Sequence, residues 1–224
     1  MNIDILHQPD SAIAKLDLAP GESITAEAGA MVAMSGSMQV DTTLRQGGGG
    51  LMGGLKRMMT GESLFLSVFQ ASDRPAELFL APKLMGDICV YPLQGNTLVV
   101  QSTGYLANTA GVNIDIGFPG LKTFFSGESL FWLSISGSGT VLLSSFGGIY
   151  DVDVDGEYIV DTGHIVAFEK TLDFSVTKAG AGWIGSILGG EGLVCRFRGR
   201  GKVYCQTHNP GAFGHLIGPR LPAR

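Results

Sequence analysis

The histidines are the first side chains whose type could support metal or acid–base chemistry. They stand at His7, His164, His208 and His215, and no two form the His-x-His pair with which one strand offers two ligands to a metal. This scattered spacing is typical of histidines with incidental structural roles. The sequence therefore predicts no metal and no cofactor at the histidines.

A run of alternating aspartates and valines, Asp151-Val152-Asp153-Val154-Asp155-Gly156, begins like a calcium-binding loop. Such a loop needs a bidentate glutamate at its twelfth position, and that position holds Thr162. Alternation of valine with a charged residue is instead the period-two pattern of a strand with outward carboxylates. We therefore expect a strand that turns in a hairpin at Asp155-Gly156.

Two further patterns resemble ligand-binding motifs. Residues 49–56 look like a phosphate-binding loop, but Leu55 separates the last glycine from the lysine, and no Ser or Thr follows to hold magnesium. Glu62, Glu128 and Glu191 each follow a glycine at similar intervals. If they met, repulsion between the carboxylates would raise at least one pKa, whereas the simpler interpretation is that each accepts hydrogen bonds from turn amides.

Three cysteines, an odd number, fit a reducing compartment. Cys195 and Cys205 flank a segment that we expect to be a hairpin, and they would face each other if its loop were three residues long. Reduced cysteines that pack as small apolar side chains are one interpretation of this pair. A redox or metal-binding pair is the alternative.

The same segment carries a small basic ribbon, and its members are Arg196, Arg198, Arg200 and Lys202. Cations at a strand edge protect it from pairing with other chains, while contact with RNA or anionic lipid is the sharper alternative. Charged residues make up only 16% of the chain and the formal net charge is −5. This balance argues against a broad nucleic-acid surface, which normally has a basic footprint.

The elements that carry these residues recur along the chain. The strands predicted at 21–29, 95–104 and 156–163 each close on a glycine that is followed by apolar residues and an alanine. A Gly-Glu landmark then begins at Gly61, Gly127 and Gly190, at separations of 66 and 63 positions. A period of this length holds several strands in each unit, and the 34 glycines suit many tight turns.

The predicted fold is therefore all-β, with three internal repeats of mostly antiparallel strands. We expect one domain over residues 1–224, with repeats at about 1–86, 87–148 and 149–210 and a short C-terminal tail. Each repeat is an incomplete sheet, and three of them packed about a pseudo-threefold axis would bury their apolar faces. The body would be a β-prism or a double-stranded β-helix.

Three glycine-rich loops, at 47–60, 117–126 and 180–189, take the same place in their repeats and are apolar where loops are normally polar. If they emerge at one pole, their apolar side chains form a candidate interaction surface. The residues are Leu51, Met52, Leu55, Met58, Met59, Leu121, Phe124, Phe125, Trp183, Ile184, Ile187 and Leu188. The alternatives are a protein interface, including self-association, a membrane surface, and loops that fold back to cap the core.

Three segments in order resemble a known family. Residues 53–65, 161–168 and 201–207 are similar to the mitochondrial biogenesis proteins named for altered inheritance of mitochondria, number twenty-four. The resemblance covers nearly the whole chain. It implies a fold like that of the tryptophan RNA-binding attenuation protein and no accepted enzymatic activity. Family members often have Gly-Pro-Gly where this chain has Gly199-Arg200-Gly201, and an arginine where it has His208.

These observations predict a protein that is not an enzyme and acts through its surfaces, as a scaffold or interaction protein. The expected partner is a second copy or another protein; peripheral contact with a membrane is an alternative, and nucleic acid is not expected. A second hypothesis is a small-molecule binding protein with a pocket between repeats. Residues 1–5 lack a secretory signal, and no run reaches the 18 apolar residues of a membrane span, so we expect a cytoplasmic location.

Overall fold

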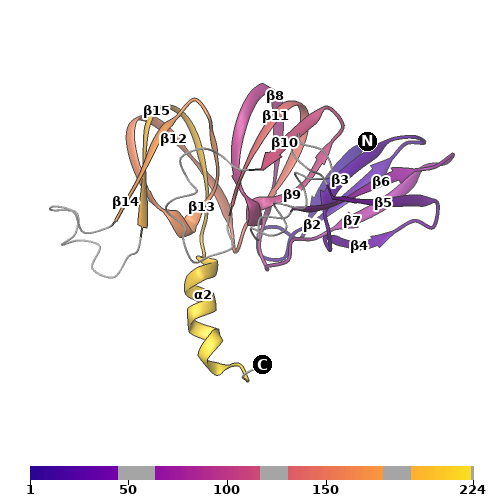
Figure 1. Ribbon diagram of the computed structural model, residues 1–224. Helices are drawn as coiled ribbons and strands as arrows, with labels where there is room; N and C mark the ends of the chain where they lie inside the picture. Colours follow the sequence, from indigo (N-terminus) through magenta and orange to yellow (C-terminus); the bar gives the residue numbers. More distant parts are fainter. Residues whose placement is uncertain (45–63, 117–130, 179–192, 223–224) are drawn as a thin grey trace.

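The protein is almost wholly β in a computed structural model that describes residues 1–44, 64–116, 131–178 and 193–222. Figure 1 shows three groups of strands side by side in chain order. The first group holds β1 (Asn2–Leu6), β2 (Ile13–Leu18), β3 (Ser23–Glu27), β4 (Met31–Met34), β5 (Met38–Leu44), β6 (Phe65–Ala71) and β7 (Ala76–Leu80). The second holds β8 (Ile88–Gln101), β9 (Tyr105–Thr109), β10 (Val112–Ile116) and β11 (Trp132–Ser144). The third holds β12 (Ile149–Asp161), β13 (Ile165–Glu169), β14 (Asp173–Lys178) and β15 (Leu193–Gln206).

The second and third groups have the same element order. In each, a long strand leads into a one-turn 3₁₀ helix, two short strands and a second long strand; the 3₁₀ helices are η1 (Ser102–Gly104) and η2 (Thr162–His164). The two long strands pair antiparallel over almost their whole length, β8 with β11 and β12 with β15. In the first group, shorter strands take these places, because β2 pairs with β7 and β3 with β6.

One short strand in each group pairs with an irregular register. On β4, β9 and β13, one residue is skipped in the pairing with β7, β11 and β15, and these residues are Val32, Leu106 and Val166. A bulge of this kind turns the bulged strand and increases its local twist. The three groups therefore share this pairing detail.

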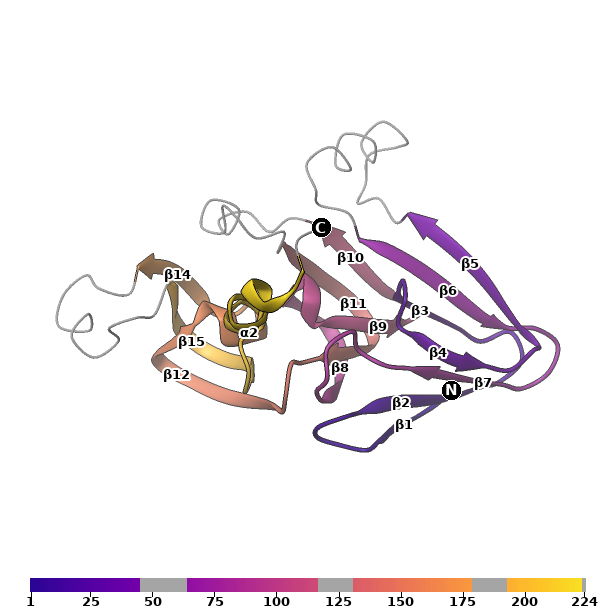
Figure 2. The same ribbon diagram turned by 90° about the horizontal axis from the view of Figure 1, so that it is seen from below.

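The strand order forms an open series. β9 lies between β11 and β3, and β13 lies between β15 and β8, so neighbouring groups are joined through short strands. β12 ends the larger sheet, and β4 ends the four-stranded sheet β1-β2-β7-β4. Figure 2 shows the corresponding arc of strands from below. The pairing confirms a mostly antiparallel all-β protein, and among the described residues it does not by itself establish the predicted pseudo-threefold axis.

Several glycines that indicated hairpins lie inside long strands. The hairpin predicted at Asp155-Gly156 is wrong, because β12 pairs with β15 through both residues. Gly95, Gly156 and Gly199 have φ values of 83°, 107° and 114°, a region that glycine reaches without steric cost. Such glycines let a strand change direction while its pairing continues, and that pattern resembles a turn in the sequence.

The C-terminal tail contains a helix that the sequence analysis missed, α2 (Pro210–Ile217), followed by η4 (Gly218–Arg220). Asn209 caps it, since its Oδ1 accepts a hydrogen bond from the amide of Ala212 at 3.1 Å, and proline stands at the first position. Both are ordinary helix-start signals. The Phe213 ring packs against Phe146 at 5.1 Å between ring centroids, which holds the helix against the segment that joins β11 to β12.

Candidate functional site

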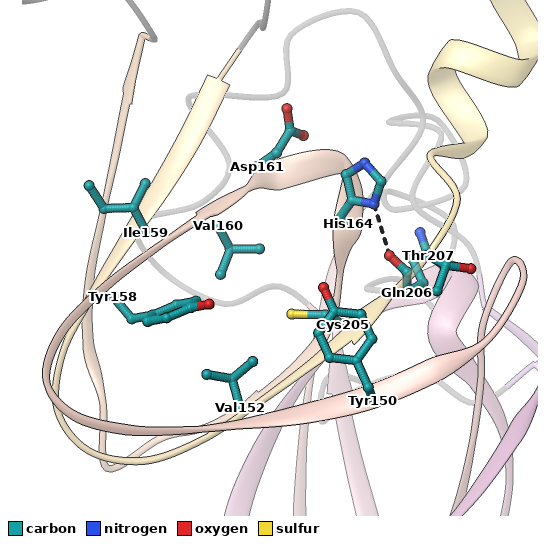
Figure 3. Close-up of a pocket in the computed structure, with 10 residues that line it drawn as sticks. All are labelled: Tyr150, Val152, Tyr158, Ile159, Val160, Asp161, His164, Cys205, Gln206 and Thr207. Atoms are coloured by element: carbon teal, nitrogen blue, oxygen red, sulfur yellow. Dashed lines mark hydrogen bonds between the residues drawn. The ribbon is translucent and has the colours of Figure 1, made fainter. Parts of the chain in front are cut away.

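An open pocket of ≈ 490 Å³ lies on the third group of strands, against β12 and β15. Figure 3 shows its side chains gathered around a hollow. The lining residues are Tyr150, Val152, Tyr158, Ile159, Val160, Asp161, His164, Cys205, Gln206 and Thr207. The lining is therefore mainly apolar and aromatic along β12, with polar groups at the rim formed by η2 and the end of β15.

The strand β12 presents two tyrosines to this pocket. Tyr150 and Tyr158 are 50% and 45% exposed, although aromatic rings of this size usually bury much more of their surface. Val152 lies between them on the strand and is half-buried. An open pocket with exposed aromatic walls is typical of a surface that binds a partner.

The buried side chain of Gln206 makes hydrogen bonds that fix the rim of the pocket. The carboxamide of Gln206 accepts a hydrogen bond from the Phe146 amide at 2.9 Å and donates one to the Gly163 carbonyl at 3.0 Å. Asp161 Oδ1 accepts from the Gly163 amide at 2.8 Å. His164 Nδ1 lies 2.8 Å from the Gln206 carbonyl oxygen, and because a carbonyl can only accept, this nitrogen is the donor. These bonds fix η2 relative to β15.

The cysteines are poorly suited to nucleophilic chemistry. Burial raises the pKa of Cys205 to about 11 and that of Cys195 to about 12, and the thiolate is the reactive form. Both lie on β15, where Cys195 is opposite Val160 and Cys205 is opposite Tyr150. The predicted hairpin that would make them face each other is wrong, because β15 is one continuous strand.

The acidic run and the basic ribbon neutralise each other across β12 and β15. Glu157 bonds Arg196 and Arg198 at 2.8 and 2.7 Å, and Asp155 bonds Arg200 at 2.9 Å. The two remaining aspartates of the run both contact Lys202, and their hydrogen bonds raise the pKa of its ammonium. Exposed pairs of this kind add little stability. They do occupy the carboxylates and the cations. The prediction that the ribbon protects a strand edge is wrong, because β15 is not an edge strand: it pairs with β12 on one side and with β13 and β14 on the other.

Metal-binding clusters are absent from the part of the chain described: there, no three His, Cys, Asp or Glu side chains gather around one point. The twelve predicted interaction residues fall outside that part, and nothing in the structure tests them. They are Leu51, Met52, Leu55, Met58, Met59, Leu121, Phe124, Phe125, Trp183, Ile184, Ile187 and Leu188. Glu62, Glu128, Glu191 and the glycine-rich residues 49–56 lie outside it as well.

Residues 3–208 match the protein family described as Mitochondrial biogenesis AIM24. The chain belongs to this family. An uncharacterised protein of Streptococcus pyogenes serotype M6 is 31% identical over 217 residues, covering 94% of this chain and 87% of the relative. A crystal structure of a Streptococcus pyogenes protein is similar with a TM-score of 0.79 and 27% identity, over 98% of this chain and 99% of that chain. The likeness extends over the whole AIM24 fold.

The strand registers correct one sequence alignment within this AIM24 chain. The strands predicted from the sequence at 95–104 and 156–163 close on Gly104 and Gly163, and aligning these glycines sets His164 against Tyr105. The pairing instead matches Tyr105 with Ile165, since each is opposite the equivalent residue of its long strand. His164 therefore takes the place of Gly104. Among the described residues, no helix has both the length and the apolar composition needed to span a membrane.

The sequence analysis missed Tyr150 and Tyr158 as binding residues. The registers make them equivalent to Cys89 and Leu98 on β8, where Leu98 is fully buried. Comparing aligned strand positions would have shown that the third group has tyrosines where the second has smaller apolar residues. That signal depends on knowing that β12 is one continuous strand, which the glycine at 156 concealed.

Proposed function

We propose that this AIM24 protein is a non-catalytic interaction protein, built from three structural repeats, that binds an extended protein segment along the free edge of β12. The observation that carries the proposal is the pocket with exposed tyrosines beside the edge of β12 that no other described strand pairs with. Extended segments bind such edges by adding a strand: backbone hydrogen bonds supply affinity, and pockets for alternate side chains supply specificity.

The edge supports this proposal because β12 is a terminal strand in the described part of the sheet and pairs there only with β15. A terminal strand presents a row of backbone donors and acceptors that can pair with another chain. Residues 158–160 combine this edge with three apolar side chains, of which Tyr158 is exposed, Ile159 half-buried and Val160 buried. The charged pairs at residues 151–157 protect the rest of the strand, which would confine binding to the apolar end.

A small-molecule binding protein is the second candidate, and the polar rim of the pocket favours it. The Asp161 carboxylate, His164 and Thr207 all line the same hollow, and a few polar groups in an apolar pocket are typical of ligand sites. Against it, the pocket is open, and its long side follows a strand edge. An extended peptide fits that shape better than a compact ligand does.

The substitution Tyr158→Asp is expected to weaken binding of extended peptides at least tenfold, about 1.4 kcal/mol. A carboxylate would be desolvated where the tyrosine ring now offers apolar surface. The measurement is fluorescence anisotropy with peptides of alternating apolar and polar residues, selected from a displayed random library on the unmodified protein. The matched control is Val90→Asp, because Val90 is 42% exposed on β8, away from the pocket.

Equal affinities for Tyr158→Asp and the unmodified protein would reject β12 as the binding edge. If proline-containing copies of the peptides bound as well as the originals, backbone pairing would be excluded. If only small molecules stabilised the protein against heat, and Tyr158→Asp removed that effect, the second candidate would be correct.

The glycine-rich apolar loops are a further proposed surface that rests on the sequence. If they dock on a membrane, Phe125→Asp and Trp183→Asp should abolish binding to anionic vesicles. If they self-associate, the same substitutions should lower the mass of the assembled species. In both cases the reason is that a charge in an apolar interface is costly. Vesicle flotation and light scattering measure these effects. Unchanged flotation and mass in both variants would remove this surface while leaving the β12 edge untouched.

A further inference from the structure

Among the described residues, the two ends of the strand series leave complementary surfaces uncovered. β4, at one end, is exposed at all four positions, and β12 ends the series on the other side. Figure 1 shows their groups at opposite ends of the molecule. The two junctions inside the chain show how such surfaces fit each other.

Both internal junctions use one register. At the first, β3 pairs with β9, and Ala26 lies opposite Ala107. At the second, β8 pairs with β13, and Val100 lies opposite Ala167. In both, the short strand pairs through the three residues that follow its skipped position. The first of these three residues is an alanine at both junctions.

At both junctions, residues from three equivalent positions of the following group cover the contact. These are the skipped residue, the alanine after it, and the residue opposite that alanine on the second long strand. At the first junction they are Leu106, Ala107 and Leu142, which pack in the core of the first group. At the second they are Val166, Ala167 and Tyr204, which pack in the core of the second group.

At the second junction, the covering residues bury apolar side chains of β8. The Tyr204 ring packs on Tyr91 at 5.6 Å between ring centroids. Leu98 and Val100 become fully buried in the same cluster as Val166. Removing that cover would leave an apolar hollow against β8.

Such a hollow exists on the third group. The equivalents of Tyr91, Leu98 and Val100 are Val152, Tyr158 and Val160, and all three line the open pocket. The covering residues that remain unused are those of the first group, where Val32 is skipped and Ala33 lies opposite Phe79. Val32 is 57% exposed, Ala33 is exposed and Phe79 is half-buried.

We propose that β4 of one copy pairs antiparallel with β12 of a second copy, with Ala33 opposite Val160 and Met34 opposite Ile159. Val32 and Phe79 then fill the pocket beside Tyr158 and Val152. This inference rests on the proposed function, because it names the segment that the β12 edge accepts. Both internal junctions serve as its template, since they join the same structural positions in the same register.

His164 requires a local adjustment of this junction relative to its template. Its equivalent at the second junction is Gly104, where an added Cβ would lie 2.8 Å from a side-chain carbon of Val166. The equivalent at the first junction is Ala30, which already carries a Cβ and is buried in the same cluster as Leu106. The His164 ring bonds to the Gln206 carbonyl. Because an added Cβ at Gly104 would also lie 3.2 Å from the Val166 carbonyl oxygen, the backbone of the incoming strand has to move at this position as well as its valine side chain.

The contact joins different surfaces of identical chains, so it is head-to-tail. Head-to-tail contacts either close into a ring or extend into a filament. The association would join the sheet that ends at β4 to the sheet that ends at β12, and both exposed edges would disappear. The edges of β4 and β12 would then be protected from other pairing by the assembly itself.

The first experiment measures mass by analytical ultracentrifugation over a wide concentration range. The unmodified protein is expected to form species larger than the single chain of 23.5 kDa, and Val32→Asp is expected to remain a single chain. Val90→Asp, a matched change of an exposed valine on β8, should assemble like the unmodified protein. Thermal unfolding of each variant checks that the fold is intact.

The second experiment traps the register. A Met34→Cys protein and an Ile159→Cys protein, mixed and oxidised, should form a disulfide-linked heterodimer, because residues directly opposite in a sheet lie within disulfide reach. Asp153→Cys replaces Ile159→Cys as the control, since it lies on the same strand outside the predicted contact. Each variant alone measures any background from Cys89, Cys195 and Cys205.

A single-chain mass at every concentration together with no cross-link would overturn the inference. An assembly that Val32→Asp leaves unchanged, or cross-linking that is equal for the Asp153→Cys control, would also overturn it. Peptide binding separates this failure from that of the proposed function. A protein that stays a single chain yet binds extended peptides at Tyr158 retains the function with a different partner, whereas loss of both removes the β12 edge altogether.

Discussion

The substitution Gly86→Ala should lower the free energy of unfolding by about 3–5 kcal/mol, at the severe end of single substitutions. A Cβ at this position would lie 2.0 Å from the Ser145 carbonyl oxygen and 2.8 Å from the Gly147 amide nitrogen. These are backbone atoms, so no side chain can rotate away. Urea and thermal denaturation measure the loss, with a midpoint shift of roughly 2–4 °C for each kcal/mol in a chain of this size.

The position of Gly86 explains why the effect should spread. Its carbonyl accepts the Ala12 amide at 2.9 Å in the first group, and it forms an isolated bridge with Gly147, which lies between the second and third groups. Opening this contact disturbs the connections of all three groups at once. Because small structural shifts at one such contact are transmitted through close-packed neighbours, we expect weaker hydrogen-exchange protection on both sides of the bridge.

Gly36→Ala is the matched control. A Cβ there has no neighbour within 4 Å among the described residues, so stability should change by no more than about 0.5 kcal/mol. If the two glycine variants unfolded at the same temperature, the close approach of Gly86 to the Ser145 backbone would be refuted.

Alternation of apolar residues predicted the strands well, because a period of two survives in any half-buried sheet. The alternating aspartates and valines at residues 151–155 indicated the first part of β12 in this way. The recurring glycine landmarks also indicated groups of similar length. The local sequence pattern was sufficient to predict both the strands and the lengths of the groups, since both features depend on residues that are close in the sequence.

The continuity of the long strands could not be predicted, because a glycine with positive φ serves a turn and a bend equally well. Gly156 illustrates this, since the turn-forming Asp155 precedes it yet it lies opposite Gly199 in an unbroken ladder. Whether the chain reverses there depends on β15, forty residues later. The helix α2 was missed for a different reason: Asn209-Pro210-Gly211 favours a turn as strongly as a helix start.

The candidate site could not be predicted from the sequence because its walls come from segments that are far apart along the chain. Tyr150 and Cys205 become neighbours only through the pairing of β12 with β15. The exposure of Tyr158 depends on which strands pair with β12, and in the described part of the sheet that strand is β15, about forty residues away in the sequence. Sequence reasoning instead selected apolar loops, where exposure is inferred from composition alone.

Replacing Gln206 by leucine should cost about 2–5 kcal/mol, because leucine keeps the volume and removes two hydrogen bonds to backbone groups. The Gln206 residue is 4% exposed, so the Phe146 amide and the Gly163 carbonyl would each lose a partner where water has little access. An unpaired buried polar group costs about 1–3 kcal/mol. Urea denaturation measures the total.

Hydrogen exchange identifies the cause of the loss in this variant. The Phe146 amide should exchange faster in Gln206→Leu than in the unmodified protein under conditions where the rest of β15 stays protected. Gln70→Leu is the control, since this glutamine is exposed and donates only a long bond of 3.3 Å to the Gly21 carbonyl. A Phe146 amide as protected as before would mean that another group satisfies it, and the pocket rim would then depend on Asp161 and His164 rather than on Gln206.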